Sequence, residues 1–157
     1  MLDATLVFCV RGNPPAEILL GMKKKGFGSG KYNGFGGKIE ANESVEAAAA
    51  RELCEECGVQ VAINDLTRVA RLEFSFPAMP DWNQVVYAFL AEQWKGEPVE
   101  TREMKPVWFR TEAIPFGKMW ADDVYWLPLV LRGKRVDAMF TFKDDNSTVA
   151  TARIRET

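Results

Sequence analysis

The chain has 157 residues, a net charge of −2 and a pI of about 5.3. A chain of this length normally forms one compact domain with its own core, so we expect a single domain over residues 1–157. Proteins that bind nucleic-acid backbones usually carry a basic face, and the net negative charge argues against such a partner. It does not exclude a small phosphorylated substrate, because a site can recruit metal ions.

The residue types present limit the catalytic mechanisms and metal ligands that the protein can use. The sequence contains no histidine, which excludes Ser-His-Asp and Cys-His catalysis and imidazole metal ligands. Acid–base or metal chemistry must therefore use carboxylates, lysine, tyrosine or thiols. Three cysteines without an export signal predict free thiols in a reducing compartment, and no stretch approaches the ~18 apolar residues that span a membrane. We expect a cytoplasmic protein without a membrane partner.

Strands and helices are expected to alternate along the chain. The predicted ranges, in chain order, are strands at 4–10 and 17–23, a glycine-rich loop at 26–37, a helix at 44–57, strands at 59–62, 67–76, 83–94 and 106–109, a helix at 122–131, and a closing hairpin from 135–142 and 148–154. Ser44 is placed to cap the first helix, and Gly58 to end it in a left-handed conformation. This order predicts an α/β fold with helices packed on a mixed sheet.

The first predicted helix carries an unusual cluster of acidic residues. Glu52, Glu55 and Glu56 are spaced so that a helix places them within an arc of roughly 100°. Such like charges repel one another, and the helix dipole disfavours anions near a C-terminus. The pattern therefore favours a bound cation, and Mg²⁺ prefers oxygen ligands that it shares with substrate phosphates. Without further context, a solvated acidic face is the alternative.

The spacing around this acidic helix matches a longer pattern. From Gly37 to Val59 the sequence reads glycine, five residues, glutamate, seven residues, Arg-Glu, an aliphatic residue, any residue, Glu-Glu, any residue, glycine and an aliphatic residue. This segment resembles the signature of the Nudix hydrolase family at every fixed position. The resemblance implies a Nudix α/β/α sandwich with a mixed β-sheet and a loop–helix–loop metal-binding motif. It also implies attack of water on a phosphorus of a nucleoside diphosphate linked to another group.

The same resemblance implies roles for individual residues. The implied metal ligands are the Gly37 carbonyl and the carboxylates of Glu52, Glu55 and Glu56. The implied ion is Mg²⁺, with Mn²⁺ as a possible substitute, and it would activate water and neutralise phosphate charge. The implied catalytic residues are Glu52, Glu56, Arg51 and Glu103, the last as an extra metal or water partner. One glutamate would act as the base, and Arg51 would pair with Glu43 to brace the loop against the helix.

Beyond the motif, most of the chain resembles one Nudix subgroup, the oxidised purine nucleoside triphosphatases. The matching stretches are 19–38, 103–109, 114–116 and 119–128. The resemblance implies a monomer that hydrolyses 8-oxo-dGTP, with 2-oxo-dATP as a second candidate, to monophosphate and pyrophosphate, and so sanitises the nucleotide pool. The residues implied to contact the nucleotide are Asn33, Asp122, Asp123, Trp120, Lys23, Phe27, Phe74, Met104, Thr5 and Leu6.

The adjacent acids Asp122 and Asp123 suggest how a purine could be read. Two crowded carboxylates resist joint ionisation, so one of them stays protonated and donates while the other accepts. Movement of this proton would let one pocket accept both oxidised guanine and oxidised adenine. The alternative is structural, since an Asp-Asp pair is also typical of a helix N-cap followed by an acid in the first turn.

Two departures from the subgroup leave the preferred base open. Gln84-Val85 stands where the subgroup often has Met-Asp, and Tyr32 stands in place of a tryptophan. A Nudix pyrophosphatase acting on an ADP-sugar, a dinucleotide or an RNA 5′ end is therefore one rival, and a nucleotide-sensing module without activity is another. Cys54 and Cys57 have the spacing of a zinc half-site, but they lie inside the helix and no second pair completes it.

Overall fold

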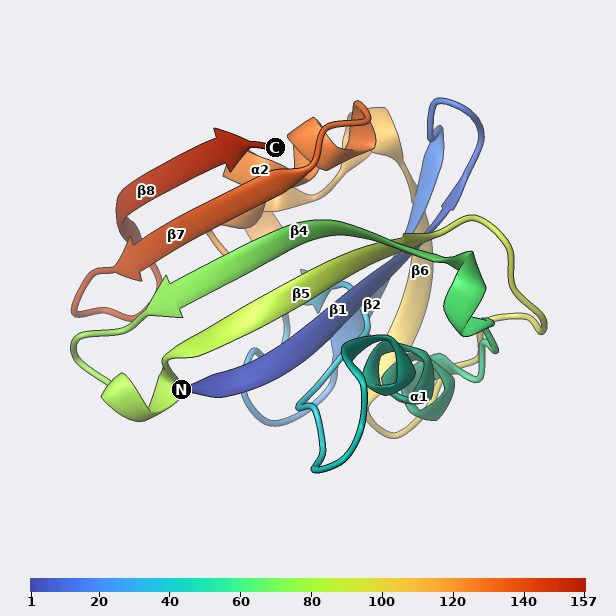
Figure 1. Cartoon of the computed structure of the whole chain (residues 1–157), viewed down its shortest axis with the longest axis horizontal. Helices are drawn as coiled ribbons and strands as arrows, with labels where there is room; N and C mark the ends of the chain where they lie inside the picture. Colours follow the sequence, from blue (N-terminus) through green and yellow to red (C-terminus); the bar gives the residue numbers. More distant parts are fainter.

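A computed structural model of the protein describes residues 1–157 as one mixed eight-stranded sheet with helices on both faces (Figure 1). The strands are β1 (Leu2–Arg11), β2 (Glu17–Lys23), β3 (Tyr32–Asn33), β4 (Leu66–Ser75), β5 (Gln84–Ala91), β6 (Met104–Arg110), β7 (Val136–Phe142) and β8 (Val149–Glu156). Their order is β3-β2-β1-β5-β4-β7-β8, and β6 pairs with β2. The pairs β1–β5 and β4–β7 are parallel and the other ladders are antiparallel.

The two α-helices cover opposite faces of this sheet. Successive side chains of a strand point to opposite faces, and β1 shows the division. Val7 packs in the core beneath α1 (Val45–Cys57), together with Leu53, whereas Phe8 packs in the core beneath α2 (Asp123–Leu131), together with Trp126. The expected α/β/α sandwich is confirmed.

Helix α1 begins and ends as its sequence predicts. The Ser44 side chain accepts a hydrogen bond from the amide of Ala47 at 3.1 Å, and Gly58 takes a left-handed conformation with φ of 78°. A left-handed residue of this kind is strained for any side chain with a Cβ atom, which is why glycine stands there. These two residues fix where the acidic turn of the helix lies.

Neither α-helix has the length and apolar character that crossing a bilayer would require.

The predicted strand at 59–62 is wrong. Only Gln60 forms a bridge there, with Lys95, and the chain then enters a 3-10 turn at Ile63–Asp65. Val59 is apolar because it fills the core beneath α1, not because it belongs to a ladder. The expected strand at 83–94 ends earlier, at Ala91.

The glycine-rich loop was also expected to lack strands. Instead it contains the short strand β3, and its second half runs along β1. The amide of Val7 donates to the carbonyl of Phe35 at 2.6 Å, and the amide of Thr5 donates to the carbonyl of Gly37 at 2.9 Å. The loop is thereby held between β1 and the helix that follows it.

Candidate active site

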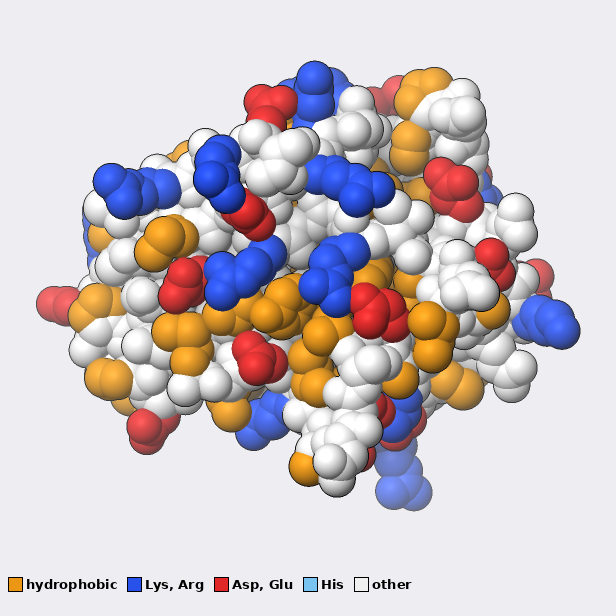
Figure 2. Space-filling view, viewed as in Figure 1, with side chains coloured by type: hydrophobic (Ala, Val, Ile, Leu, Met, Phe, Trp, Pro, Cys, Tyr) orange, Lys and Arg blue, Asp and Glu red, His pale blue; other side chains and the backbone are white.

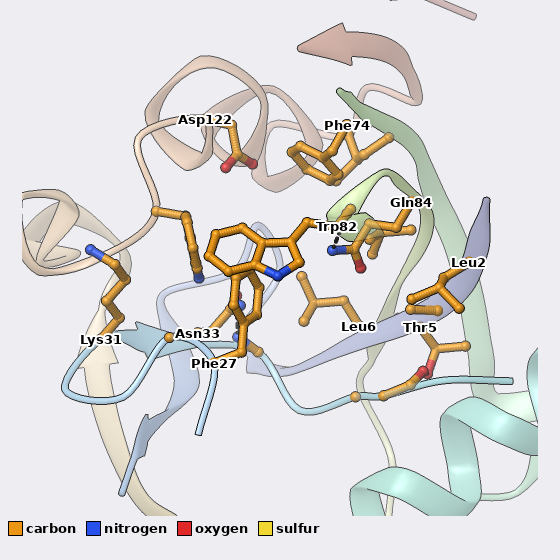
Figure 3. A pocket seen from close by; sticks show the side chains of 18 of the residues that line it. Leu2, Thr5, Leu6, Phe27, Lys31, Asn33, Phe74, Trp82, Gln84 and Asp122 are labelled. Atoms are coloured by element: carbon orange, nitrogen blue, oxygen red, sulfur yellow. Dashed lines mark hydrogen bonds between the residues drawn. The ribbon is translucent and has the colours of Figure 1, made fainter. Parts of the chain in front are cut away.

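A cavity of about 480 Å³ opens between the glycine-rich loop, β1 and the start of α2 (Figure 3). All of the residues predicted to contact a nucleotide lie in its wall: Thr5, Leu6, Lys23, Phe27, Asn33, Phe74, Met104, Trp120, Asp122 and Asp123. They come from β1, β2, β3, β4, β6, α2 and the loops before β3 and α2. The fold therefore gathers residues that are far apart in the sequence. Of the predicted metal-binding and catalytic residues, Gly37 and Glu56 also line the cavity.

Glu56 is held at one end of the cavity by the backbone. Its carboxylate accepts a hydrogen bond from the amide of Gly36 at 2.7 Å, and the residue is only 5% exposed. Burial raises the pKa of Glu56 to about 7, and the nearby charge of Glu52 adds to the rise, while the bond from Gly36 and the charge of Lys23 oppose it. A carboxyl group with a pKa near neutrality is able to accept and release protons at physiological pH.

Glu52 lies one helical turn before Glu56, against Gly37. A Cβ atom built on Gly37 would lie 2.6 Å from the carboxyl carbon of Glu52, so the two groups are in close contact. Burial is the main cause that raises the pKa of Glu52, and the charges of Glu55 and Glu103 contribute. Glu103 also raises the pKa of Glu56. The side chains of Glu52, Glu56 and Glu103 therefore share one acidic environment.

A hydrogen bond positions the segment that carries Glu103. The hydroxyl of Thr101 donates to the carbonyl of Glu56 at 2.8 Å, which ties the start of β6 to the end of α1. Lys24 forms an ion pair with Glu100 in the same region, so its ammonium group is engaged outside the cavity. Of the three consecutive lysines at 23–25, only Lys23 lines the cavity.

Arg51 connects the loop before α1 to the helix. Its guanidinium donates to both carboxylate oxygens of Glu43, at 2.6 and 2.9 Å, and to the carbonyl of Lys38 at 3.2 Å. The same side chain contacts Glu52 at 3.0 Å and Glu55 at 3.3 Å. Its hydrogen bonds lower the pKa of Glu43 to about 2. Arg51 thus braces the loop as expected, and it turns Glu55 toward itself at the exposed side of the helix.

The opposite end of the cavity holds the two buried aspartates. Asp122 is 3% exposed and Asp123 is 2% exposed. The Asp122 carboxylate accepts a hydrogen bond from the indole of Trp126 at 2.9 Å, while Oδ2 of Asp123 is buried without any partner. Asp122 occupies the N-cap position of α2, but its side chain makes no capping bond. The capping interpretation is therefore wrong for this side chain.

The burial of these aspartates favours their neutral form. Burial is the main cause that raises the pKa of both groups, and repulsion from Asp122 raises the pKa of Asp123 further. A buried polar atom left unpaired costs about 1–3 kcal/mol. Because Asp123 faces the cavity, a ligand that bonded to Oδ2 would recover this cost.

Several residues of the cavity wall were missed at the level of sequence. They include Leu2, Lys31, Phe76, Trp82 and Phe142, and Gln84 was noted only as a departure. Lys31 lies over the ring of Trp120, with its ammonium 5.2 Å from the ring centroid. None of these residues belongs to a motif with fixed spacing, so no sequence signal would have singled them out.

The acidic helix and its bracing loop lie in a segment that matches a known protein family. A family model described as NUDIX domain matches residues 2–130. The chain belongs to the NUDIX family. The matched range includes the glycine-rich loop, α1 and most of α2, and so it contains every residue assigned above to the candidate site except Phe142.

Two curated NUDIX relatives match over most of their length. The chain is 46% identical over 139 residues to an oxidized purine nucleoside triphosphate hydrolase of Danio rerio, covering 88% of this chain and 85% of the relative. It is 43% identical over 142 residues to a protein of the same name from Mus musculus, covering 90% and 88%. A mutator MutT protein of Bacillus halodurans has the same fold, with a TM-score of 0.84, 22% identity, and coverage of 98% and 97%.

Nudix hydrolases generally use a divalent metal, and the residues present suit a hard cation. Beyond the effect of burial, the charge of Glu103 raises the pKa of both Glu52 and Glu56, and the charge of Glu52 raises the pKa of Glu56; a cation would relieve this repulsion. Carboxylate and carbonyl oxygens are the ligands that Mg²⁺ and Mn²⁺ prefer. No three acidic side chains form a ready-made cluster, and Glu55 contacts Arg51. The types of donor present therefore fit the implied metal, and Glu55 would have to leave Arg51 to join them.

We expect Gly37→Ala and Gly36→Ala to have different effects. In Gly37→Ala the new methyl meets the end of the Glu52 side chain, which can move away. Stability should stay near wild type, while displacement of the carboxylate lowers hydrolase activity by on the order of 100-fold. In Gly36→Ala the methyl would lie 1.7 Å from the carbonyl oxygen of Thr5, so the backbone must shift and the protein should be strongly destabilised. Urea unfolding and initial rates measure both effects, and a fully active Gly37→Ala would contradict the assigned geometry.

The raised pKa of Asp123 predicts a pH-dependent difference in stability. The folded protein holds this proton more tightly than the unfolded chain, so the wild-type free energy of unfolding falls as pH rises from about 4 through the folded pKa. Asp123→Asn removes this loss, and its stability relative to wild type should increase with pH.

Asp145 supplies a matched control of opposite sign. Hydrogen bonds from Thr148 and Ser147 lower the pKa of its exposed carboxylate to about 2, so its stabilising contribution is present above pH ~4 and is lost as pH falls through the folded pKa. Asp145→Asn should therefore become less stable relative to wild type as pH rises. Urea unfolding at several pH values measures both slopes, and equal slopes would show that Asp123 is not buried as described.

Proposed function

We propose that the protein is a Mg²⁺-dependent hydrolase that cleaves oxidised purine nucleoside triphosphates to the monophosphate and pyrophosphate. The substrates proposed are 8-oxo-dGTP and 2-oxo-dATP, so that the enzyme would remove damaged nucleotides from the pool. The observation that carries the proposal is a single cavity with a backbone-held carboxylate, Glu56, at one end and the unpaired Asp123 beside Trp120 at the other. The names of the relatives from Danio rerio and Mus musculus support the same substrate class.

At the acidic end, the chain would bind the triphosphate and activate water. Mg²⁺, or Mn²⁺ in its place, would be held by Glu52, Glu55, Glu56 and the Gly37 carbonyl, and when bound it lowers the pKa of water and neutralises phosphate charge. Glu52, Glu56 and Glu103 are the carboxylates able to accept the proton from the attacking water. Lys23 lies beside Glu56 and would contact a phosphate. Arg51 keeps the glycine-rich loop fixed while charge builds on the phosphate oxygens.

At the opposite end, the chain would bind and read the base. Stacking on Trp120 is worth about 1–3 kcal/mol but discriminates little among purines. Hydrogen bonds supply the discrimination, because a mismatched base leaves a buried group unpaired. Oδ1 of Asn33 accepts from the amide of Gly34 at 2.9 Å, which leaves its NH₂ group to donate into the cavity. Asp123, protonated, would donate to the base, and Asp122 would accept. Thr5, Leu6, Phe27, Phe74 and Met104 complete the wall.

We also propose that one domain carries this activity and acts as a monomer on free nucleotides. The hairpin β7–β8, which lies beyond the matched family range, continues the same sheet through the parallel pairing of β7 with β4. Figure 2 shows acidic and basic side chains interspersed over one face, without the continuous basic area that an RNA backbone would need. The net charge of −2 supports the same proposal.

Steady-state hydrolysis of a nucleotide panel tests the function. With Mg²⁺, kcat/KM should be at least about tenfold higher for 8-oxo-dGTP or 2-oxo-dATP than for dGTP and dATP, with pyrophosphate as product. ADP-ribose and a dinucleoside polyphosphate are included as alternative Nudix substrates, and a preference for either would overturn the proposal. Glu56→Gln should lower kcat by about 10²–10⁴-fold, and unchanged turnover in this variant would exclude Glu56 as a catalytic group.

The two aspartates allow a separate test of base reading. Asparagine keeps the shape of each side chain but cannot exchange a proton with its neighbour. Asp122→Asn and Asp123→Asn should therefore each change the ratio of kcat/KM between 8-oxo-dGTP and 2-oxo-dATP, in opposite directions if the two groups have different protonation states. If both variants keep the wild-type ratio, proton exchange between Asp122 and Asp123 does not determine base preference.

A further inference from the structure

Five aromatic side chains form a closed ring in the wall of the cavity. In order they are Trp120, Phe27, Trp82, Phe76 and Phe142, and we call this set the aromatic collar. The centroids of successive rings are 5.0, 4.6, 5.7 and 4.7 Å apart, and Phe142 closes the ring to Trp120 at 6.1 Å. All five line the cavity. Because each ring contacts two others, the position of each depends on both neighbours.

Trp82 belongs to a turn that is held in place by hydrogen bonds. Its amide donates to the carbonyl of Met79 at 2.9 Å, and its carbonyl accepts from the side chain of Gln84 at 3.3 Å. The side chain of Asn83 accepts from the amide of Phe76 at 2.6 Å, which ties the two ends of the turn together. Figure 3 shows the indole of Trp82 across the centre of the cavity, between Asp122 and Leu6. The turn therefore presents Trp82 to the cavity as a fixed wall.

Phe27 is placed on a less constrained segment. It stands between Gly26 and Gly28, which both have positive φ, and it is 43% exposed. Its ring contacts Trp82 edge-on, with 67° between the planes, and lies tilted by 32° to Trp120. The indole of Trp120 also packs on the backbone of Gly28, where a Cβ atom would lie 3.3 Å from Nε1. Phe27 is thus held in place from two sides, by Trp82 and by Trp120.

We propose that Trp82 is a positioning residue for the nucleotide base. It holds Phe27 against Trp120 and so closes the outer wall of the base pocket. The inference rests on the proposed function and adds a residue outside every motif of the sequence. Trp82 contacts none of the acidic groups at the other end of the cavity, so its effect falls on base binding and not on the chemical step.

A double-variant cycle tests this proposal. The variants are Trp82→Ala, Trp82→Phe, Phe27→Ala and the double Trp82→Ala/Phe27→Ala. The measurements are the KM and kcat for 8-oxo-dGTP, and the Kd for its product 8-oxo-dGMP by calorimetry without metal. An aromatic contact of this kind is worth about 2–10-fold in affinity. Trp82→Ala should therefore raise KM and Kd by about 3–10-fold with kcat within about twofold, and Trp82→Phe should recover most of the loss.

The double variant separates positioning from direct contact. If Trp82 acts through Phe27, the double variant should bind no more weakly than Phe27→Ala alone, because contacting residues are not additive. Fully additive losses, wild-type KM and Kd in Trp82→Ala, or no recovery in Trp82→Phe would each overturn the proposal. Trp94→Ala is the matched control, since Trp94 stacks on Trp108 at 5.9 Å and does not line the cavity. It should leave KM and Kd unchanged.

Failure of the proposed function gives a different result. In that case the wild-type protein would hydrolyse another nucleotide of the panel in preference to oxidised purines. The same four variants are then measured with that nucleotide and its base-containing product. A non-additive loss of binding would still support the role of Trp82, and an additive loss or none would still overturn it.

Discussion

The hydrogen bond from the Gly36 amide to the buried carboxylate of Glu56 is the contact on which the candidate site depends. It joins the glycine-rich loop to α1 at the point where the helix carries its acidic residues. The loop in turn lies so close to β1 that a methyl group on Gly36 would overlap the backbone of Thr5. Strand, loop and helix are therefore locked together, and the raised pKa of Glu56 follows from the burial that this packing imposes. Arg51 reinforces the same junction from the solvent side through Glu43.

The elements that could be predicted from the sequence are those set by local chemistry. Helix α1 has its cap at Ser44 and its left-handed end at Gly58, and both are properties of a few adjacent residues. The segment 59–62 has the composition of a strand, but a strand needs a partner along its whole length, and here only the single bridge between Gln60 and Lys95 forms. The short strand at Tyr32–Asn33 was not predicted, because the surrounding glycines favour a loop. Only its pairing with β2 makes this segment a strand.

The candidate site likewise contains residues that the sequence predicts and residues that only the folded chain reveals. Periodicity alone places Glu52 and Glu56 on one face of a helix, and the family resemblance added the residues of the base pocket, all of which the fold brings to one cavity. The sequence left two interpretations of Asp122 open, and the structure excludes capping, because the carboxylate bonds to Trp126 one turn further along the same helix and caps nothing. Trp82 could not be found at all, since its relation to Phe27 exists only when two separate turns meet.

The two ends of the cavity are formed by different parts of the residues, main-chain groups at one end and side chains at the other. The acidic end is anchored by main-chain groups: a glycine amide, a carbonyl and the close approach of two backbones. The base end is built from side chains that belong to several unconnected segments. Main-chain anchors survive most substitutions, whereas side-chain walls change with each one. Related sequences can therefore drift in the nucleotide they prefer while keeping the same hydrolytic apparatus, and a designer who wishes to alter selectivity should begin at the base end and leave the glycine-rich loop untouched.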